Sequence, residues 1–307
     1  MGRPLRITYP GAHYHVTSRG NEQKDIYKSR RDREQFLSYL ESSVTRYGAK
    51  IHAYCLMTNH YHLLLETPGG NLPEILRHIN GAYTNYYNTK RKRSGHLFQG
   101  RYKAILIEAD EYLMELTRYI HLNPVRCGMV TRPGEHPWSS YKDYIGDRPK
   151  PAWLCTDTVL SQFGDGNKYR QFVEHMLVME YENPLRNVIA STLLGSEPFV
   201  QEIIATHLDG KQMERDVPAM RELSKTRKIE MIIENVSGIF GDAGLEQKVG
   251  IYLAHRRSGA RLKELGEYFN KKDSAIAQTT RRLIGKMAAD GSLKKKVEEL
   301  EKRLRLS

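Results

Sequence analysis

IHAYCLMTNHYHLLLE, residues 51–66, predicts two β-strands joined by a turn. The strands are expected at Ile51–Leu56 and His60–Glu66, with the turn around Met57–Asn59. The second strand contains the continuous apolar run Leu63–Leu65, which is typical of a strand that is buried on both faces. Such a strand gives rigid support to the side chains at its polar end.

The rest of the N-terminal half adds further strands and helices to this hairpin. Alternating, aromatic-rich segments predict strands, and apolar residues at helical spacing predict helices. The elements expected are a strand at 13–18, helices at 32–47 and 72–87, a strand at 103–108, and a helix from 110 to about 122 that ends ahead of Pro124. This order predicts an α+β fold in which helices cover an antiparallel sheet.

Composition shifts divide the chain into four predicted parts. Residues 1–150 form the first domain, and residues 151–224 form a helical extension and linker, in which a helix at 157–182 packs back on the first domain. Residues 225–290 form an all-α domain, and residues 291–307 form a charged C-terminal helix. The helices expected in the third part span 229–240, 245–257, 262–269 and 274–287.

Charge and composition narrow the class of partner. The chain has 307 residues, 39% of them hydrophobic, and a net charge of +12, which favours a polyanion such as nucleic acid. We find no apolar run that could span a bilayer and no signal segment, so no membrane partner is expected. Cys55, Cys127 and Cys155 are scattered without a C-x-x-C pair, which fits a reducing cytoplasm and predicts no zinc knuckle.

Two histidines lie at the start of the second strand of the hairpin. Because strand side chains alternate, His60 and His62 point to the same face of the sheet, as a pair of metal ligands would. The pattern alone is weak, because His13 and His15 repeat it on another predicted strand, where satisfied or surface histidines are the alternative. The apolar run that follows His62 favours the later pair as ligands.

A tyrosine and an asparagine share one face of the last predicted helix of this domain. Tyr119 and Asn123 are four residues apart, which is one helical turn. Three more polar or basic residues crowd this helix end: Arg118, His121 and Arg126. The chain holds 19 tyrosines, most of which must pack in the core or contact phosphates. A phenol with a pKa near 10 is a poor nucleophile at neutral pH unless a cation or base assists it.

If the two faces meet, they form a site for attack on a phosphodiester. His60, His62 and the Asn123 oxygen would hold a metal ion, and Tyr119 would lie beside it. Two imidazole nitrogens, one amide oxygen and open positions for phosphate oxygens suit magnesium or manganese. The alternative for Asn123 is a structural residue in the last helical turn before a proline.

Several motifs resemble those of one enzyme family. The run Thr58–Leu65 resembles the histidine–hydrophobic–histidine (HUH) motif of single-tyrosine transposases. Residues Tyr119–Gly128 resemble the tyrosine helix of one branch, the REP-associated tyrosine transposases, and His15–Asn21 and Gly100–Lys103 are also similar to that branch. The resemblance covers about residues 8–145, in the order of the family. Tyr61 departs from it, because this position is often aliphatic.

The resemblance implies an HUH nuclease-like core with His60, His62 and Asn123 as metal ligands and Tyr119 as the nucleophile. It implies attack on single-stranded DNA, giving a 5′-phosphotyrosine link and a free 3′-hydroxyl. The expected partners are hairpins of palindromic repeats, and the expected protein is a bacterial, cytoplasmic and nucleoid-associated monomer or homodimer. His13 and His15 would then be structural residues or DNA contacts.

Basic residues elsewhere in the first domain are candidate DNA contacts. The run Lys90–Arg93 lies near four aromatic residues, which could stack on unpaired bases while cations hold phosphates: Tyr83, Tyr86, Tyr87 and Phe98. The full set of candidates is Arg19, Lys90, Arg91, Lys92, Arg93, Arg101, Arg118 and Arg126, with Arg3 and Arg6 as further ones. A solvated basic loop is the alternative for residues 90–93.

The C-terminal helices resemble a second kind of DNA-binding protein. Residues Leu245–Met287 are similar to the DNA-binding domain of the bacterial chromosomal replication initiator, which binds duplex DNA through a helix-turn-helix. That domain usually carries a histidine at or next to the position of Ser274, so its base readout is not carried over. The candidate contacts are Ser274, Thr279, Thr280, Arg281 and Arg282. A helical protein-interaction module is the alternative.

Two other functions compete with a single-tyrosine transposase. One is a non-catalytic DNA-binding regulator that descends from such an enzyme. The other is a relaxase or rolling-circle initiator that uses two tyrosines. Tyr112 precedes Tyr119 by seven residues, or two helical turns, and would face the same way.

Overall fold

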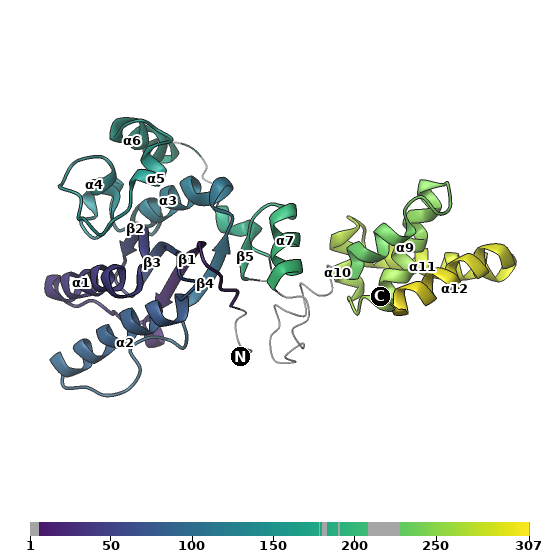
Figure 1. Ribbon diagram of the computed structural model, residues 1–307, viewed down its shortest axis with the longest axis horizontal. Helices are drawn as coiled ribbons and strands as arrows, with labels where there is room; N and C mark the ends of the chain where they lie inside the picture. The colour runs from purple at the N-terminus through teal and green to yellow at the C-terminus, as the bar shows by residue number, and fades with distance from the viewer. Residues whose placement is uncertain (1–5, 178, 180–182, 190, 208–227, 307) are drawn as a thin grey trace. The chain divides into compact units, whose positions relative to one another are not determined.

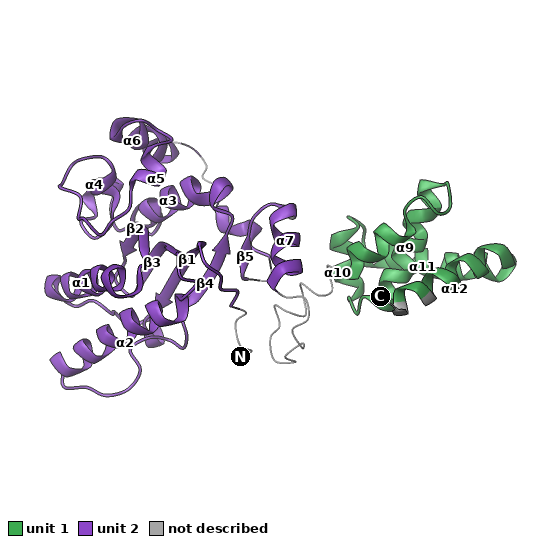
Figure 2. Ribbon diagram, in the orientation of Figure 1, with its two compact units in different colours: residues 1–3, 211–307 green, residues 4–210 purple. Residues whose placement is uncertain are grey.

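The computed structural model describes residues 6–177, 179, 183–189, 191–207 and 228–306. These residues fall into two compact units, one within residues 4–210 and one within residues 211–307 (Figure 2). Arg3, residues 208–223 and the basic run 224–227, on which some of the sequence predictions fall, lie outside the described residues.

A five-stranded sheet forms the centre of the first unit, in the order β2-β3-β1-β4-β5 (Figure 1). Its strands are β1 (Ala12–Arg19), β2 (Lys50–Leu56), β3 (His60–Thr67), β4 (Lys103–Ile107) and β5 (Leu193–Leu194). The pairs β2–β3, β3–β1 and β1–β4 are antiparallel, and only the two-residue β5 runs parallel to its neighbour β4. The predicted α+β fold with an antiparallel sheet is confirmed, and the sequence did not predict β5.

Helices cover both faces of this sheet (Figure 1). One face packs against α1 (Arg30–Tyr47) and α2 (Leu72–Lys90): the Tyr61 ring lies 4.9 Å from the ring of Phe36, and its hydroxyl donates to Asn80 at 2.8 Å. The opposite face packs against α3 (Ala109–Arg126), whose apolar residues share a buried cluster with Leu64 of β3. Because side chains alternate along β3, His60 and His62 lie on the α3 face and Tyr61 on the other.

Local signals set both ends of α1, whereas α3 continues past the proline that was expected to end it. Ser29 caps α1 by accepting from the Asp32 amide, and Gly48 ends it with φ +66°, as expected of a glycine cap. The helix α3, predicted to end near residue 122, continues through Pro124 to Arg126. Proline lacks one backbone donor, but the Cys127 and Met129 amides still bond to carbonyls of the last turn, so the helical path is kept. This continuation keeps Asn123 within regular helix.

The prediction of one helix over residues 157–182 is wrong. The chain instead forms α5 (Asp157–Leu160), α6 (Gly166–Glu174) and the short 3-10 helix η3 (His175–Leu177), followed later by α7 (Glu197–His207). The break occurs at Gly164, with φ +82°, and Asp165, which caps α6 by accepting from the Lys168 amide. The remaining short elements are η1 (Asn21–Gln23), η2 (Pro133–Glu135), α4 (Tyr141–Tyr144) and η4 (Pro184–Asn187).

This helical extension packs on α3, as predicted, and fixes its position. His121 of α3 is fully buried, with Nδ1 2.7 Å from the Tyr169 hydroxyl of α6 and Nε2 2.8 Å from the Ser140 hydroxyl. Burial lowers the pKa of His121 to about 3, so the ring is neutral and serves as a hydrogen-bonded link. The extension therefore supports the helix that carries Tyr119.

The second unit is all-α. A helix at residues 228–236 is followed by α9 (Ala243–Arg257), α10 (Leu262–Tyr268), α11 (Asp273–Ala289) and α12 (Gly291–Leu306). Its core combines residues from every helix, including Leu293, Val297 and Leu300 of α12. The turn between α10 and α11 requires Gly266, because a Cβ there would lie 2.6 Å from the Lys271 carbonyl oxygen.

None of the helices in the described part of the chain combines the length and the hydropathy that crossing a bilayer requires.

Candidate active site and DNA-contact surfaces

Two histidines of β3 form the base of the candidate active site. His62 is 6% exposed, and its Nδ1 lies 3.0 Å from Nε2 of His15 on the adjacent strand β1. His60 lies at the start of β3, with its ring centroid 5.0 Å from that of His62 and its Nδ1 2.7 Å from the Asn59 side-chain oxygen. Each ring is thus held through one nitrogen, which fixes the direction of the other.

The helix α3 brings Tyr119 and Asn123 to these histidines. The Tyr119 ring packs edge-on against both His62 and His15, with each pair of centroids 5.9 Å apart. Asn123 is buried one turn later, and its Nδ2 donates to the Tyr119 carbonyl at 2.9 Å, which leaves its Oδ1 available to a cation. The structure therefore brings together all four residues that the sequence singled out.

Burial keeps the imidazoles of this site neutral. It lowers the pKa of His15 to about 4 and that of His60 to about 4, the latter with help from the Arg19 charge. The pKa of His62 falls well below its ordinary value because of burial, and the neighbouring His15 and His60 add to the effect. A neutral imidazole carries a lone pair, which is the form that binds a metal.

The donor atoms of the site fit a divalent metal ion. Nε2 of His62 is buried without a hydrogen-bond partner among the described residues, which leaves a lone pair or proton unsatisfied unless a ligand binds there. For this nitrogen to bind a cation, Nδ1 of His62 must carry the proton and donate it to His15. His60 and the Asn123 oxygen complete a set of two nitrogens and one oxygen. From the sequence, His15 was either a less favoured ligand candidate, paired with His13, or a structural or DNA-contact residue. Its position on β1, diagonally across from His62, depends on the strand register and was missed.

Two exposed cations flank this group. The Arg126 guanidinium lies 4.9 Å from the centre of the Tyr119 ring. Arg19 is the cross-strand partner of His60, at the end of β1. The Arg19 charge acts on His60 and the Arg126 charge acts on His62, so both cations lie close to the histidines of the site.

Other predicted DNA contacts have structural partners. The side chain of Asp32 is fully buried, and it accepts hydrogen bonds from Lys90, at 2.8 Å, and from Arg91. Burial alone would raise the pKa of Asp32, but these two hydrogen bonds, with a third from the Lys28 amide and the charge of Arg91, outweigh it and hold the pKa well below the ordinary value. Arg118 is 7% exposed, pairs with Glu115 and lies 4.1 Å from the centre of the Phe172 ring. The exposed basic residues of this set are Lys90, despite its bond to Asp32, and Lys92, Arg93 and Arg101.

The expected stacking of bases on Tyr83 and Tyr87 is wrong. Both rings are buried, at 0% and 2% exposed, and their hydroxyls donate to the Ile26 and Asp25 carbonyls. They hold α2 against the segment that carries Asp25 and Ile26, because each hydroxyl satisfies a backbone acceptor there while the ring fills the core. Phe98 is likewise 8% exposed.

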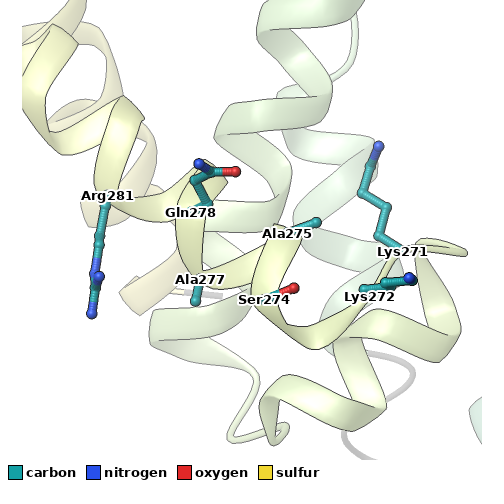
Figure 3. A pocket seen from close by; sticks show the side chains of 7 residues that line it. All are labelled: Lys271, Lys272, Ser274, Ala275, Ala277, Gln278 and Arg281. Carbon is teal, nitrogen blue, oxygen red and sulfur yellow. The ribbon is translucent and has the colours of Figure 1, made fainter.

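The second unit carries a basic hollow at the start of α11 (Figure 3). It is lined by Lys271, Lys272, Ser274, Ala275, Ala277, Gln278 and Arg281. Two of the predicted contacts, Ser274 and Arg281, are therefore in it. Arg282 is exposed, Thr279 donates to the Ala275 carbonyl at 2.7 Å, and Thr280 is 8% exposed and faces the core, which removes it as a DNA contact.

Comparisons with known proteins find similar transposases. Residues 8–123 match the family model described as "Transposase IS200 like". The chain is 26% identical over 118 residues to a protein of Haemophilus influenzae named as a REP-associated tyrosine transposase, a match that covers 35% of this chain and 67% of that protein.

Two solved structures are also similar. One, a REP-associated tyrosine transposase bound to a REP hairpin, gives a TM-score of 0.42 at 16% identity and covers 50% of this chain and 92% of its own. The other, described as a transposase of Deinococcus radiodurans, gives a TM-score of 0.28 at 19% identity and covers 39% of this chain and 94% of its own. Residues 8–123, which include His60, His62, Tyr119 and Asn123, are a domain of the IS200-like transposase family.

Proposed function

We propose that this protein is a metal-dependent transposase that cleaves and rejoins single-stranded DNA through a 5′-phosphotyrosine intermediate. The observation that carries the proposal is the contact of Tyr119 with His62, together with His60 and Asn123 at the same site. The family of residues 8–123 supports a role in DNA transposition.

The chemistry exchanges one phosphoester bond for another. The Tyr119 oxygen attacks phosphorus, the bond from phosphorus to the 3′ oxygen of the preceding nucleotide breaks, and the phenolic proton is transferred to that leaving oxygen. The products are a 5′-phosphotyrosine and a free 3′-hydroxyl, and no water is consumed. A 3′-hydroxyl can then attack the phosphotyrosine and restore the tyrosine, which joins strands.

His60, His62 and Asn123 would hold the metal ion of this reaction, Mg²⁺ or Mn²⁺. When bound, the ion polarises the phosphate and neutralises the charge that develops on its oxygens. His15 acts on His62 rather than on DNA, because it accepts the Nδ1 proton and so orients the ligand. Arg19 and Arg126 bind the phosphates on either side of the reacting one.

The second unit is proposed to bind duplex DNA through a helix-turn-helix formed by α10 and α11. The basic hollow at the start of α11 supports this, because it exposes Lys271, Lys272 and Arg281 beside a helix N-terminus. The first unit would bind a hairpin of a palindromic repeat, the ligand named for one of the similar structures. Monomer and homodimer remain predictions for the assembly.

A covalent-adduct assay tests the proposal. Single-stranded oligonucleotides with hairpins, taken from the DNA that flanks this gene, are mixed with the full chain in Mn²⁺, Mg²⁺ or EDTA and resolved under denaturing conditions. Wild-type protein should form a metal-dependent adduct, and Tyr119→Phe should form none. Tight hairpin binding without an adduct would instead support the regulator, and an adduct that depends on Tyr112 would support a two-tyrosine enzyme.

A further inference from the structure

A second group of possible metal ligands lies at the other end of the same sheet face. It consists of His13 on β1, His52 on β2 and Glu66 on β3. His13 and Glu66 are cross-strand partners, and His52 falls at the register shift between Ile51 and Ala53. The extra residue at this irregularity places the His52 ring against that of His13, with centroids 5.4 Å apart.

The spacing of the three ligand atoms suits a tetrahedral ion. Oε2 of Glu66 lies 3.5 Å from Nε2 of His13 and 3.6 Å from Nε2 of His52, and all three atoms lie within 4.8 Å of one another. Metal–ligand bonds of about 2.0–2.1 Å in a tetrahedron put neighbouring ligand atoms about 3.3–3.4 Å apart. The observed separations are close to that value and too long for hydrogen bonds.

The buried ring of His52 is the main evidence that this group binds an ion. Its side chain is fully buried, and neither ring nitrogen has a hydrogen-bond partner within the described residues, although Glu66 and the backbone of Cys155 lie near it. Native structures rarely leave a buried polar group unsatisfied, and an unplaced ion is one of the accepted reasons.

Glu66 keeps one oxygen for such an ion. Lys50 binds Oε1 at 3.0 Å, and Oε2 faces the two histidines. The side chains of His13 and Glu66 are 18% and 14% exposed, which gives water access to the open side of the group. Two imidazole nitrogens and one carboxylate oxygen with a water in the fourth position are a ligand set typical of zinc.

We propose that His13, His52 and Glu66 bind a zinc ion that joins β1, β2 and β3. This site shares no ligand with His60, His62 and Asn123, and it does not depend on the transposase chemistry proposed above. The zinc ion would satisfy the buried His52 ring and cross-link three strands that are otherwise held by their backbone ladders and packing.

Zinc titration of the full chain tests this proposal. The experiments use the double variant His60→Ala/His62→Ala as the background, because it lacks the histidine ligands of the proposed catalytic site. Zinc bound to this variant can therefore be assigned to other sites. The chelator-treated protein is titrated with Zn²⁺ against a chromogenic chelator, and bound zinc is measured by elemental analysis. We expect one zinc per chain, and we expect Co²⁺ in its place to give the visible absorption of a tetrahedral site.

Single changes added to this background decide which residues bind the ion. Glu66→Gln keeps the size of the side chain. Glu66→Gln and His52→Leu should each weaken zinc binding by at least about tenfold, because even the loss of a residue that only supports a metal ligand weakens binding about 10- to 100-fold. His96→Ala removes an exposed histidine outside the site and should leave binding unchanged. Circular dichroism of the zinc-free variants checks that they fold.

Two results would overturn the proposal. One is a background variant that binds no zinc. The other is unchanged zinc affinity in the folded Glu66→Gln variant, which decides the question even if His52→Leu fails to fold.

Discussion

Replacement of His15 tests how the candidate active site is organised. His15 is 2% exposed, and its Nε2 accepts from Nδ1 of His62 at 3.0 Å in our account. His15→Leu keeps an apolar side chain of similar size but leaves the buried His62 proton without an acceptor, which costs about 1–3 kcal/mol. Changes to outer-shell partners of this kind weaken metal binding about 10- to 100-fold. The two magnitudes agree, since each factor of ten is about 1.4 kcal/mol.

The assay measures the initial rate of adduct formation against Mn²⁺ concentration. His15→Leu should shift the half-maximal concentration upward by about 10- to 100-fold and approach the wild-type rate at saturation. His15→Gln offers an amide oxygen near the position of Nε2 and should recover most of the shift. Thr17→Val, on the same strand and opposite His62, serves as the matched control. An unchanged Mn²⁺ dependence in a folded His15→Leu protein would mean that His15 does not orient His62 for metal binding.

Three further predictions concern stability and duplex binding. Asp32→Asn should lower the free energy of unfolding by about 2–3 kcal/mol, measured by denaturant titration. This loss is smaller than the about 3–5 kcal/mol expected when a fully buried ion pair is broken, because Lys90 is partly exposed. Because the pKa of Asp32 is depressed in the fold, its contribution is present above about pH 4 and lost as the pH falls further, so the wild-type protein should lose more stability in acid than Asp32→Asn. Gly266→Ala should destabilise the second unit by about 1–3 kcal/mol, which circular dichroism would measure. The fluorescence of the two tryptophans should not change, because both belong to the first unit. Arg281→Gln should reduce the slope of log affinity against log salt for duplex DNA by about 1 without changing adduct formation, whereas the charge-matched Lys294→Gln should leave the slope unchanged.

Patterns of local sequence predicted the elements that carry the site. The alternation in residues 60–66 and the apolar stripes of the helices depend on neighbours in sequence, and β3, α1 and α2 form where they were expected. The spacing of His60 and His62, and that of Tyr119 and Asn123, follows directly from strand and helix geometry. That the two pairs come together depends on which face of the sheet α3 covers. The motif resemblance implied this arrangement, but the periodicity of the sequence did not.

Features that depend on contacts distant in sequence were missed. Tyr83 and Tyr87 seemed free to stack on bases, but their hydroxyls find backbone carbonyls some 60 residues away. The ion pairs of Lys90 and Arg91 with Asp32 are equally non-local. The grouping of His13, His52 and Glu66 depends on the register of the strands and on the irregularity in β2. Neither feature can be predicted from the pattern of a single segment.

In the proposed reaction, Tyr119 joins itself to DNA with the help of a metal ion at His60, His62 and Asn123. The most direct test is mass spectrometry of the peptide that carries the DNA adduct, from wild-type, Tyr112→Phe and Tyr119→Phe proteins in Mn²⁺. We expect a nucleotide on Tyr119 in the wild-type and Tyr112→Phe proteins, and none in Tyr119→Phe or in EDTA. A nucleotide on another residue, or an adduct that forms equally well in EDTA, would contradict it.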